Sequence, residues 1–150
     1  MREILFKAKR IDNGEWVEGY LFDNGFDGKE KKYFIGGLII EKYNGTACDK
    51  WDITGIDFCE IDPETLCQFT GLYDKNGKRI WENDIVFVTD ENDCSGQIST
   101  GIGNVIFIEG MWYIDGRPQE GLYDINKVFQ IEVIGNAFDN QELLQEESDE

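Results

Sequence analysis

Two acidic residues separated by one position, Glu82 and Asp84, come closer to a reactive centre than any other pair in this sequence. Paired carboxylates can divide acid and base work between them or hold Mg²⁺. Carboxylates this close together in a turn more often accept hydrogen bonds from the backbone N–H groups of that turn. We therefore predict a bracing role for both, within a candidate interaction surface, and assign no catalytic residue. The chain is predicted not to be an enzyme.

A second acidic group contains Asp90, Glu91 and Asp93. Three carboxylates this close could hold Ca²⁺, but the glycine and the terminal glutamate of an EF-hand loop are missing. We interpret the group as a solvated loop that belongs to the candidate interaction surface.

The four cysteines also fail to form a metal or redox motif. Cys48, Cys59, Cys67 and Cys94 match no zinc-ribbon or CxxC spacing, and the chain contains no histidine that could complete a mixed site. Cys94 lies among acidic residues, which disfavour a reactive thiolate. We predict reduced thiols, with no metal and no cofactor.

The segment 70–77 contains glycines but lacks the Gly-Lys-Ser/Thr ending of a phosphate loop, so a β-turn explains it better. Aromatic and basic residues alternate here: Tyr73, Lys75, Lys78, Arg79 and Trp81. A second basic island, with Lys7, Lys9 and Arg10, lies near the N-terminus. Rings beside positive charge can stack single-stranded bases. Packing within a sheet is the competing interpretation of these rings.

Charge restricts the partners further. The 150 residues include 14 basic and 31 acidic ones, for a formal net charge of −17. Residues 89–150 alone carry 2 basic and 14 acidic residues. Such a field repels the phosphates of duplex DNA. It can simply keep the protein soluble, or it can attract a basic partner.

The pattern of short apolar runs between turn residues predicts a mainly β fold of antiparallel hairpins, α+β at most. Residues 4–8 and 16–22 form the first hairpin around Asp12-Asn13-Gly14, whose Asn-Gly pair accepts positive φ. Further strands are expected at 33–43, 58–61, 65–70, 85–88, 104–108, 111–114 and 129–134, with a short helix at 140–145. The segment 44–57 receives no firm assignment. The order of the later strands suggests a small SH3-like barrel in the C-terminal half.

The chain is expected to form one domain over 1–150, with 1–62 and 63–145 as alternative lobes and 146–150 as a frayed acidic tail. Its first residues lack the apolar run of a signal peptide, and no apolar segment approaches the length of a membrane span. We therefore expect a cytoplasmic protein that does not enter a membrane. Its aromatic residues and short strands also favour a homo-oligomer.

The segment 63–86, PETLCQFTGLYDKNGKRIWENDIV, closely resembles the signature of the YopX family, and the chain's two ends resemble the ends of that family. Where the family pattern usually has Glu-Gly-Asp, this chain has Glu82-Asn83-Asp84. Asparagine tolerates a left-handed backbone, so the turn is expected to survive. The resemblance implies a mainly β protein of temperate phages and prophages of Gram-positive bacteria, with no established biochemical activity.

Two functions remain at this point. The first is a non-enzymatic interaction module that presents an acidic face to a basic host or phage protein, with DNA mimicry as a special case. The alternative is a single-stranded nucleic-acid-binding module in phage replication or regulation, which would use the basic islands.

Overall fold

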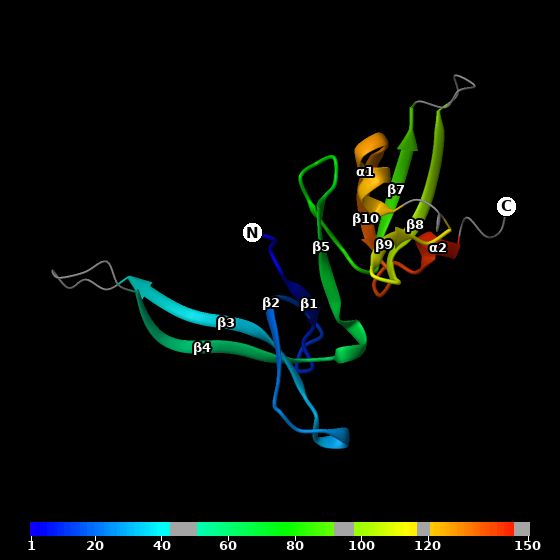
Figure 1. The fold of residues 1–150 in the computed structure, drawn as a ribbon. Helices are drawn as coiled ribbons and strands as arrows, with labels where there is room; N and C mark the ends of the chain where they lie inside the picture. Colours follow the sequence, from blue (N-terminus) through cyan, green and yellow to red (C-terminus); the bar gives the residue numbers. More distant parts are fainter. Residues whose placement is uncertain (43–50, 92–97, 117–120, 146–150) are drawn as a thin grey trace. The chain divides into compact units, whose positions relative to one another are not determined.

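The computed structural model describes residues 1–42, 51–91, 98–116 and 121–145 (Figure 1). Antiparallel strands dominate this part of the chain, which confirms the mainly β prediction. The chain divides into two units. Unit 1 contains Met1–Glu3 and Gln68–Glu150, and unit 2 contains Ile4–Cys67.

Unit 2 is a sheet of four antiparallel strands in the order β4-β3-β2-β1. The strands are β1 (Phe6–Lys9), β2 (Trp16–Asp23), β3 (Tyr33–Lys42) and β4 (Trp51–Ile61). The β1–β2 hairpin confirms the prediction, and Gly14 in its turn has a φ of 71°. Short 3-10 helices, η1 (Gly28–Glu30) and η2 (Pro63–Thr65), follow β2 and β4. Part of β4 falls in the segment that sequence reasoning left unassigned.

Glycine allows β3 and β4 to approach each other closely. A Cβ atom on Gly36 would lie 2.0 Å from the carbonyl oxygen of Asp57, far inside contact distance. Beyond this point β3 and β4 continue as a long two-stranded ribbon, seen in Figure 1. We call residues 36–42 and 51–58 the arm. Its sequence packs many apolar side chains into two strands.

The core of unit 2 is small. Three side chains are fully buried in it, namely Ala8, Ile35 and Ile61. Partly buried neighbours complete the cluster: Phe6, Val17, Leu21, Tyr33 and Leu66. The Lys9 N–H donates to the Thr65 hydroxyl at 2.8 Å, which ties η2 to β1.

Unit 1 contains the β5–β6 hairpin and an open four-stranded sheet in the order β10-β7-β8-β9. The bounds are β5 (Cys67–Tyr73), β6 (Arg79–Trp81), β7 (Asp84–Asp90), β8 (Ser99–Ile108), β9 (Met111–Ile114) and β10 (Gln130–Asn136). Two helices accompany them, α1 (Leu122–Val128) and α2 (Glu142–Gln145). The strands predicted at 85–88, 104–108, 111–114 and 129–134 are thus confirmed as β7, β8, β9 and β10. The helix predicted at 140–145 is confirmed as α2.

The predicted SH3-like barrel is not formed by the described strands. Closure would require β9 to pair with β10, but both stand at opposite edges of the sheet. Helix α1 contacts both of these strands, and its Leu122 and Ile125 enter the core. A helix therefore supplies the apolar cover that the remaining strands of a barrel would have supplied.

The described helices are short, α1 being the longest at 7 residues, and none has the length and apolar character of a membrane span.

Candidate functional site

The turn from Tyr73 to Arg79, at the centre of the signature segment, is organised by the carboxylate of Asp74. Its Oδ1 accepts hydrogen bonds from the backbone N–H groups of Asn76 at 2.9 Å and Lys78 at 2.8 Å. Its Oδ2 accepts one from the N–H of Val133 in β10, at 3.0 Å. Asp74 is only 6% exposed. One buried side chain therefore both shapes the turn and fastens it to the sheet.

Two further bonds hold the same turn. The N–H of Lys75 donates to the carbonyl of Ile131 at 2.9 Å, and the Asn126 amide donates to the carbonyl of Tyr73 at 3.0 Å. Burial alone would raise the pKa of Asp74, but the three N–H donors outweigh it and hold that pKa below its ordinary value. Asp74 is therefore an ionised structural group at neutral pH.

The second turn, Glu82-Asn83-Asp84, uses its carboxylates in the same way. Oδ2 of Asp84 accepts from the N–H of Trp81 at 2.8 Å, and Oε1 of Glu82 accepts from the N–H of Gln68 at 3.2 Å. Asp84 is 2% exposed. Both carboxylates therefore brace backbone, but Glu82 accepts from β5 and not from its own turn as predicted. Burial raises the pKa of Glu82, while the hydrogen bond from Gln68 acts in the opposite direction.

Asn83 stands where the family pattern usually has glycine, and it adopts the predicted left-handed conformation with a φ of 65°. Its N–H donates to the carbonyl of Val105, and its carbonyl accepts from Ala137, both at 2.8 Å. The turn thus survives the departure from glycine and joins β8 to the segment after β10.

The aromatic and basic candidates pack against one another. Trp81 is 4% exposed, and its ring lies 5.5 Å from that of Phe69. The Arg79 guanidinium lies over the Phe69 ring, 5.4 Å from its centroid. Arg79 also forms an ion pair with Glu3 at 3.1 Å. Tyr73 remains 45% exposed. Of the rings of Phe69, Trp81 and Tyr73, only that of Tyr73 is exposed.

Lysines of the same turn differ in their surroundings. Lys75 pairs with Glu132 at 3.4 Å, and Lys78 is exposed. The other basic island belongs to unit 2, where Lys7 and Lys9 lie over the ring of Trp16 at 4.9 and 5.5 Å. Arg10 in that island forms an ion pair with Asp12. Much of the positive charge of both islands is therefore already matched by carboxylates or rings.

Exposed carboxylates of unit 1 lie outside these turns. Asp90 ends β7 and is half-buried, whereas Glu91 is exposed and accepts a hydrogen bond from Gln130 at 3.2 Å. Asp93 falls outside the described residues. In the described part of 98–145, five exposed carboxylates were not among the predicted site residues: Glu109, Asp115, Asp124, Asp139 and Glu142. The charge count over 89–150 was the only signal that pointed to them.

The described residues contain no cluster of three His, Cys, Asp or Glu side chains that could hold a metal ion. Cys59 is half-buried and Cys67 is buried, and both are free thiols, as predicted. Cys67 donates to the carbonyl of Thr65 at 3.3 Å. Cys48 and Cys94 lie outside the described residues.

Comparison with known proteins gives a family and a fold. The family model described as "YopX protein" matches residues 6–145. A crystal structure of protein EF1440 from Enterococcus faecalis is similar to this chain, with a TM-score of 0.58 and 21% identity. The similarity covers 96% of this chain and 99% of that one. No curated protein matches the sequence.

Proposed function

Because this chain belongs to the YopX family, and because its signature segment builds two backbone turns, we propose that it acts as a non-enzymatic interaction module encoded by a phage or prophage. Its acidic unit 1 binds a basic protein of the host or the phage. The binding surface consists of the exposed carboxylates that follow the signature segment, and not of the signature turns themselves.

The observation that carries this proposal is the distribution of charge between the two units. Unit 1 has 6 basic and 18 acidic residues, a formal charge of −12, whereas unit 2 has 8 basic and 13 acidic residues, a formal charge of −5. Asp74 and Asp84 are buried against backbone N–H groups. Most of the remaining described carboxylates of unit 1 are exposed or half-buried, so their negative field reaches solvent.

A field of this sign favours association with a positively charged surface and raises the rate of encounter at low salt. The effect weakens as ionic strength rises, because the Debye length falls to about 10 Å at 0.1 M salt and to about 3 Å at 1 M. Binding to a basic partner should therefore be strongly dependent on salt.

Single-stranded nucleic acid is less well supported as a ligand. The side chain of Trp81 is buried, and Lys75 and Arg79 lie in ion pairs with Glu132 and Glu3. Stacking would depend on Tyr73 within a unit of charge −12, which repels phosphates.

The test is a low-salt pull-down from host lysate, with and without nuclease, in which retained proteins are identified by mass spectrometry. We expect a basic protein that stays bound after nuclease treatment and elutes at about 0.5 M salt. Retention that disappears with nuclease would replace this proposal by the nucleic-acid alternative. Absence of any retained protein at low salt would contradict the proposal.

Charge-neutralising variants then locate the surface. A fourfold variant in unit 1, with Glu91→Gln, Asp115→Asn, Asp124→Asn and Glu142→Gln, should weaken partner binding at least about tenfold, since each charge contributes to a common field. The matched control neutralises four exposed carboxylates of unit 2, Asp27, Glu30, Glu41 and Asp52, and changes the net charge equally. Equal weakening by both variants would show an effect of total charge only.

A further inference from the structure

One face of the sheet in unit 2 combines many large apolar side chains with high exposure. We call it the arm face. The exposed fractions are 62% for Tyr20, 53% for Leu38, 50% for Ile40, 67% for Trp51, 65% for Ile53, 58% for Ile56 and 52% for Phe58. Each of these residues alone would be unremarkable on a protein surface, but seven together form a patch.

The strand register places these residues on one side. Residues that are directly opposite in paired strands share a face, and every second residue along a strand returns to it. The pairs Leu38↔Ile56, Ile40↔Ile53 and Lys42↔Trp51 follow one another along the arm, and a register shift between Ile39 and Ile40 skips one residue of β4 so that Ile53 follows Ile56. Tyr20 continues the face on β2, where it is opposite Gly36. Ile35, one residue earlier on β3, points to the other side and enters the small core.

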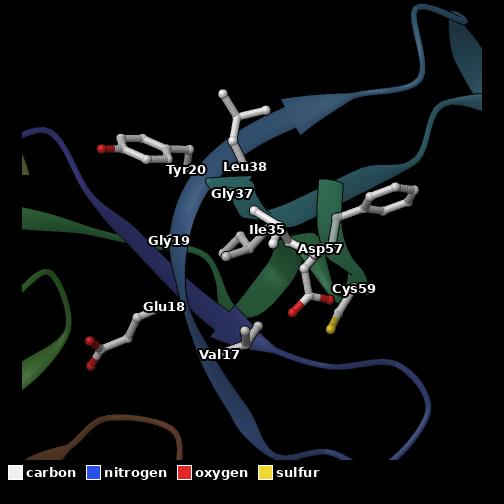
Figure 2. Close-up of a pocket in the computed structure, with 12 residues that line it drawn as sticks. Val17, Glu18, Gly19, Tyr20, Ile35, Gly37, Leu38, Asp57 and Cys59 are labelled. Atoms are coloured by element: carbon white, nitrogen blue, oxygen red, sulfur yellow. The ribbon is translucent and has the colours of Figure 1, made fainter. Parts of the chain in front are cut away.

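The two sides are visible at the base of the arm. Figure 2 shows Tyr20 and Leu38 on one side of the strands, with Asp57 and Cys59 on the other. The arm face is also hollowed, with a cavity of about 670 Å³ lined by Tyr20, Phe22, Leu38, Ile40, Ile56 and Phe58. The rings of Phe22 and Phe34 both pack edge to face against Phe58, with centroid distances of 5.9 Å and 5.3 Å, and stack on each other at 6.4 Å. Aromatic rings therefore form part of the lining of the hollow.

The area of this face corresponds to that of a stable protein interface. If each half-exposed large side chain offers about 100 Å², the seven give roughly 700 Å². A standard interface buries about 800 Å² on each partner, whereas the largest apolar patch of a typical monomer is about 300–600 Å². A patch of this size calls for a cover of similar area and similar apolar character.

We propose that a second copy of this chain covers the arm face, in a two-fold pair whose arms run antiparallel. A two-fold interface brings the same patch of both copies together, so an apolar face is its own complement. The charged residues of the face give a test of this orientation. Lys42 lies on this face at the far end of the arm, and Glu18 lies on it near the base, two residues before Tyr20 and directly opposite Lys7 of β1. Antiparallel pairing brings each Lys42 toward the Glu18 of the other copy.

The first experiment measures the molar mass of the full chain by light scattering during size-exclusion chromatography, at about 5 and about 100 μM. We expect a mass twice the 17.3 kDa of one chain. Leu38→Glu should raise the dissociation constant at least about 100-fold, because the charge enters a two-fold interface at two places. The matched control is Ile39→Glu, the next residue on the same strand, which is 46% exposed on the opposite face. This control should remain a dimer.

A charge swap tests the orientation. Lys42→Glu and Glu18→Lys should each weaken the pair, and the two together should restore it, as expected for residues that meet across the interface. A wild-type monomer at about 100 μM would overturn the proposal, as would equal sensitivity to Leu38→Glu and Ile39→Glu. A swap without restoration would overturn the antiparallel orientation. The dimer should persist at 0.5 M salt, whereas the partner binding proposed for unit 1 should be lost there. A failure of the dimer proposal is therefore distinguishable from a failure of the proposed partner binding.

Discussion

The two units bury apolar side chains to very different extents. Unit 1 has a core cluster of eight buried residues, to which the sheet, the β5–β6 hairpin and α1 all contribute. The cluster of unit 2 has three, although unit 2 carries the long apolar arm. In unit 1 a helix covers the sheet. In unit 2, the described apolar side chains of the arm lie largely at the surface.

This difference teaches how each unit can interact. Unit 1 buries the larger apolar cluster and carries most of the excess negative charge, so associations through that charge should weaken with salt. Unit 2 leaves the apolar side chains of the arm exposed, and association through these side chains should resist salt. One chain of 150 residues thus carries two surfaces with opposite physical behaviour. The following changes are intended to affect one unit and leave the other intact.

The largest effect is expected from Asp74→Ala in unit 1. The substitution leaves the N–H groups of Asn76, Lys78 and Val133 without their acceptor. Hydrogen bonds to charged groups contribute about 1.5–3 kcal/mol each, so loss of these three should lower the free energy of unfolding of unit 1 by at least about 4.5 kcal/mol. Hydrogen exchange measured by mass spectrometry should show lost protection in β5–β10 and little change in β1–β4.

Asp115→Asn, at an exposed aspartate of unit 1, is the control and should change stability by less than about 0.5 kcal/mol. Equal loss of protection in both units after Asp74→Ala would contradict the division of the chain.

The corresponding change in unit 2 is Gly36→Ala. Its Cβ would lie 2.0 Å from the Asp57 carbonyl oxygen, so β3 and β4 must move apart. We expect a loss of about 3 kcal/mol, confined to β1–β4 and measured by the same exchange experiment. Gly55→Ala in the same arm is the matched control, because its Cβ would lie at an ordinary 3.5 Å from Ile39. If both variants lost the same stability, the close approach of β3 and β4 at Gly36 would not be the reason that this position requires glycine.

The elements that sequence reasoning found are those with local causes. Asn13-Gly14 predicted the first hairpin, and the β-turn predicted within 70–77 contains the local bond from the Asn76 N–H to Asp74. The bond from Asp74 to Val133 joins residues 59 positions apart and has no local signal. Helix α1 was missed because 7 residues show too little periodicity.

The same distinction applies to the site. The sequence identified Trp81 as a candidate for interaction because basic residues surround it, but its packing against Phe69 depends on how β5 and β6 meet. The first strand of the arm was predicted at 33–43, but 44–57 received no firm assignment, although Asn44-Gly45 is a turn signal of the same kind as Asn13-Gly14. Exposure is a tertiary property, and a run of Leu and Ile gives no indication of it.

A moderate effect is expected at Asn83 in unit 1. Its φ of 65° disfavours β-branched side chains, so Asn83→Val should cost about 2 kcal/mol, measured by urea unfolding. Asn83→Gly, which restores the residue usual in the family pattern, should stay within about 1 kcal/mol of wild type. A larger loss with glycine than with valine would show that the asparagine side chain, and not the backbone conformation, holds this turn.

The smallest effect is expected from Glu82→Gln. Glutamine keeps an oxygen for the Gln68 N–H and removes the charge whose burial raises the pKa of Glu82. A raised pKa means that the folded state binds the proton more tightly, so this group stabilises the fold at low pH and loses that contribution as pH rises above 4.5. The variant should therefore match wild type near pH 4 and exceed it by less than about 1 kcal/mol at pH 7.

Asp74 provides the opposite dependence, because its pKa is lowered and its contribution is lost as pH falls below 3.8. Urea midpoints at about pH 2.5, 4, 5.5 and 7 separate the two, with Glu109→Gln as an exposed control. Lower stability of Glu82→Gln at pH 7 would mean that the ionised carboxylate has a favourable partner in the folded protein. That result would return Glu82 to the functional candidates. The signature turns of unit 1 could then no longer be treated as purely structural, in contrast to the exposed carboxylates that follow them.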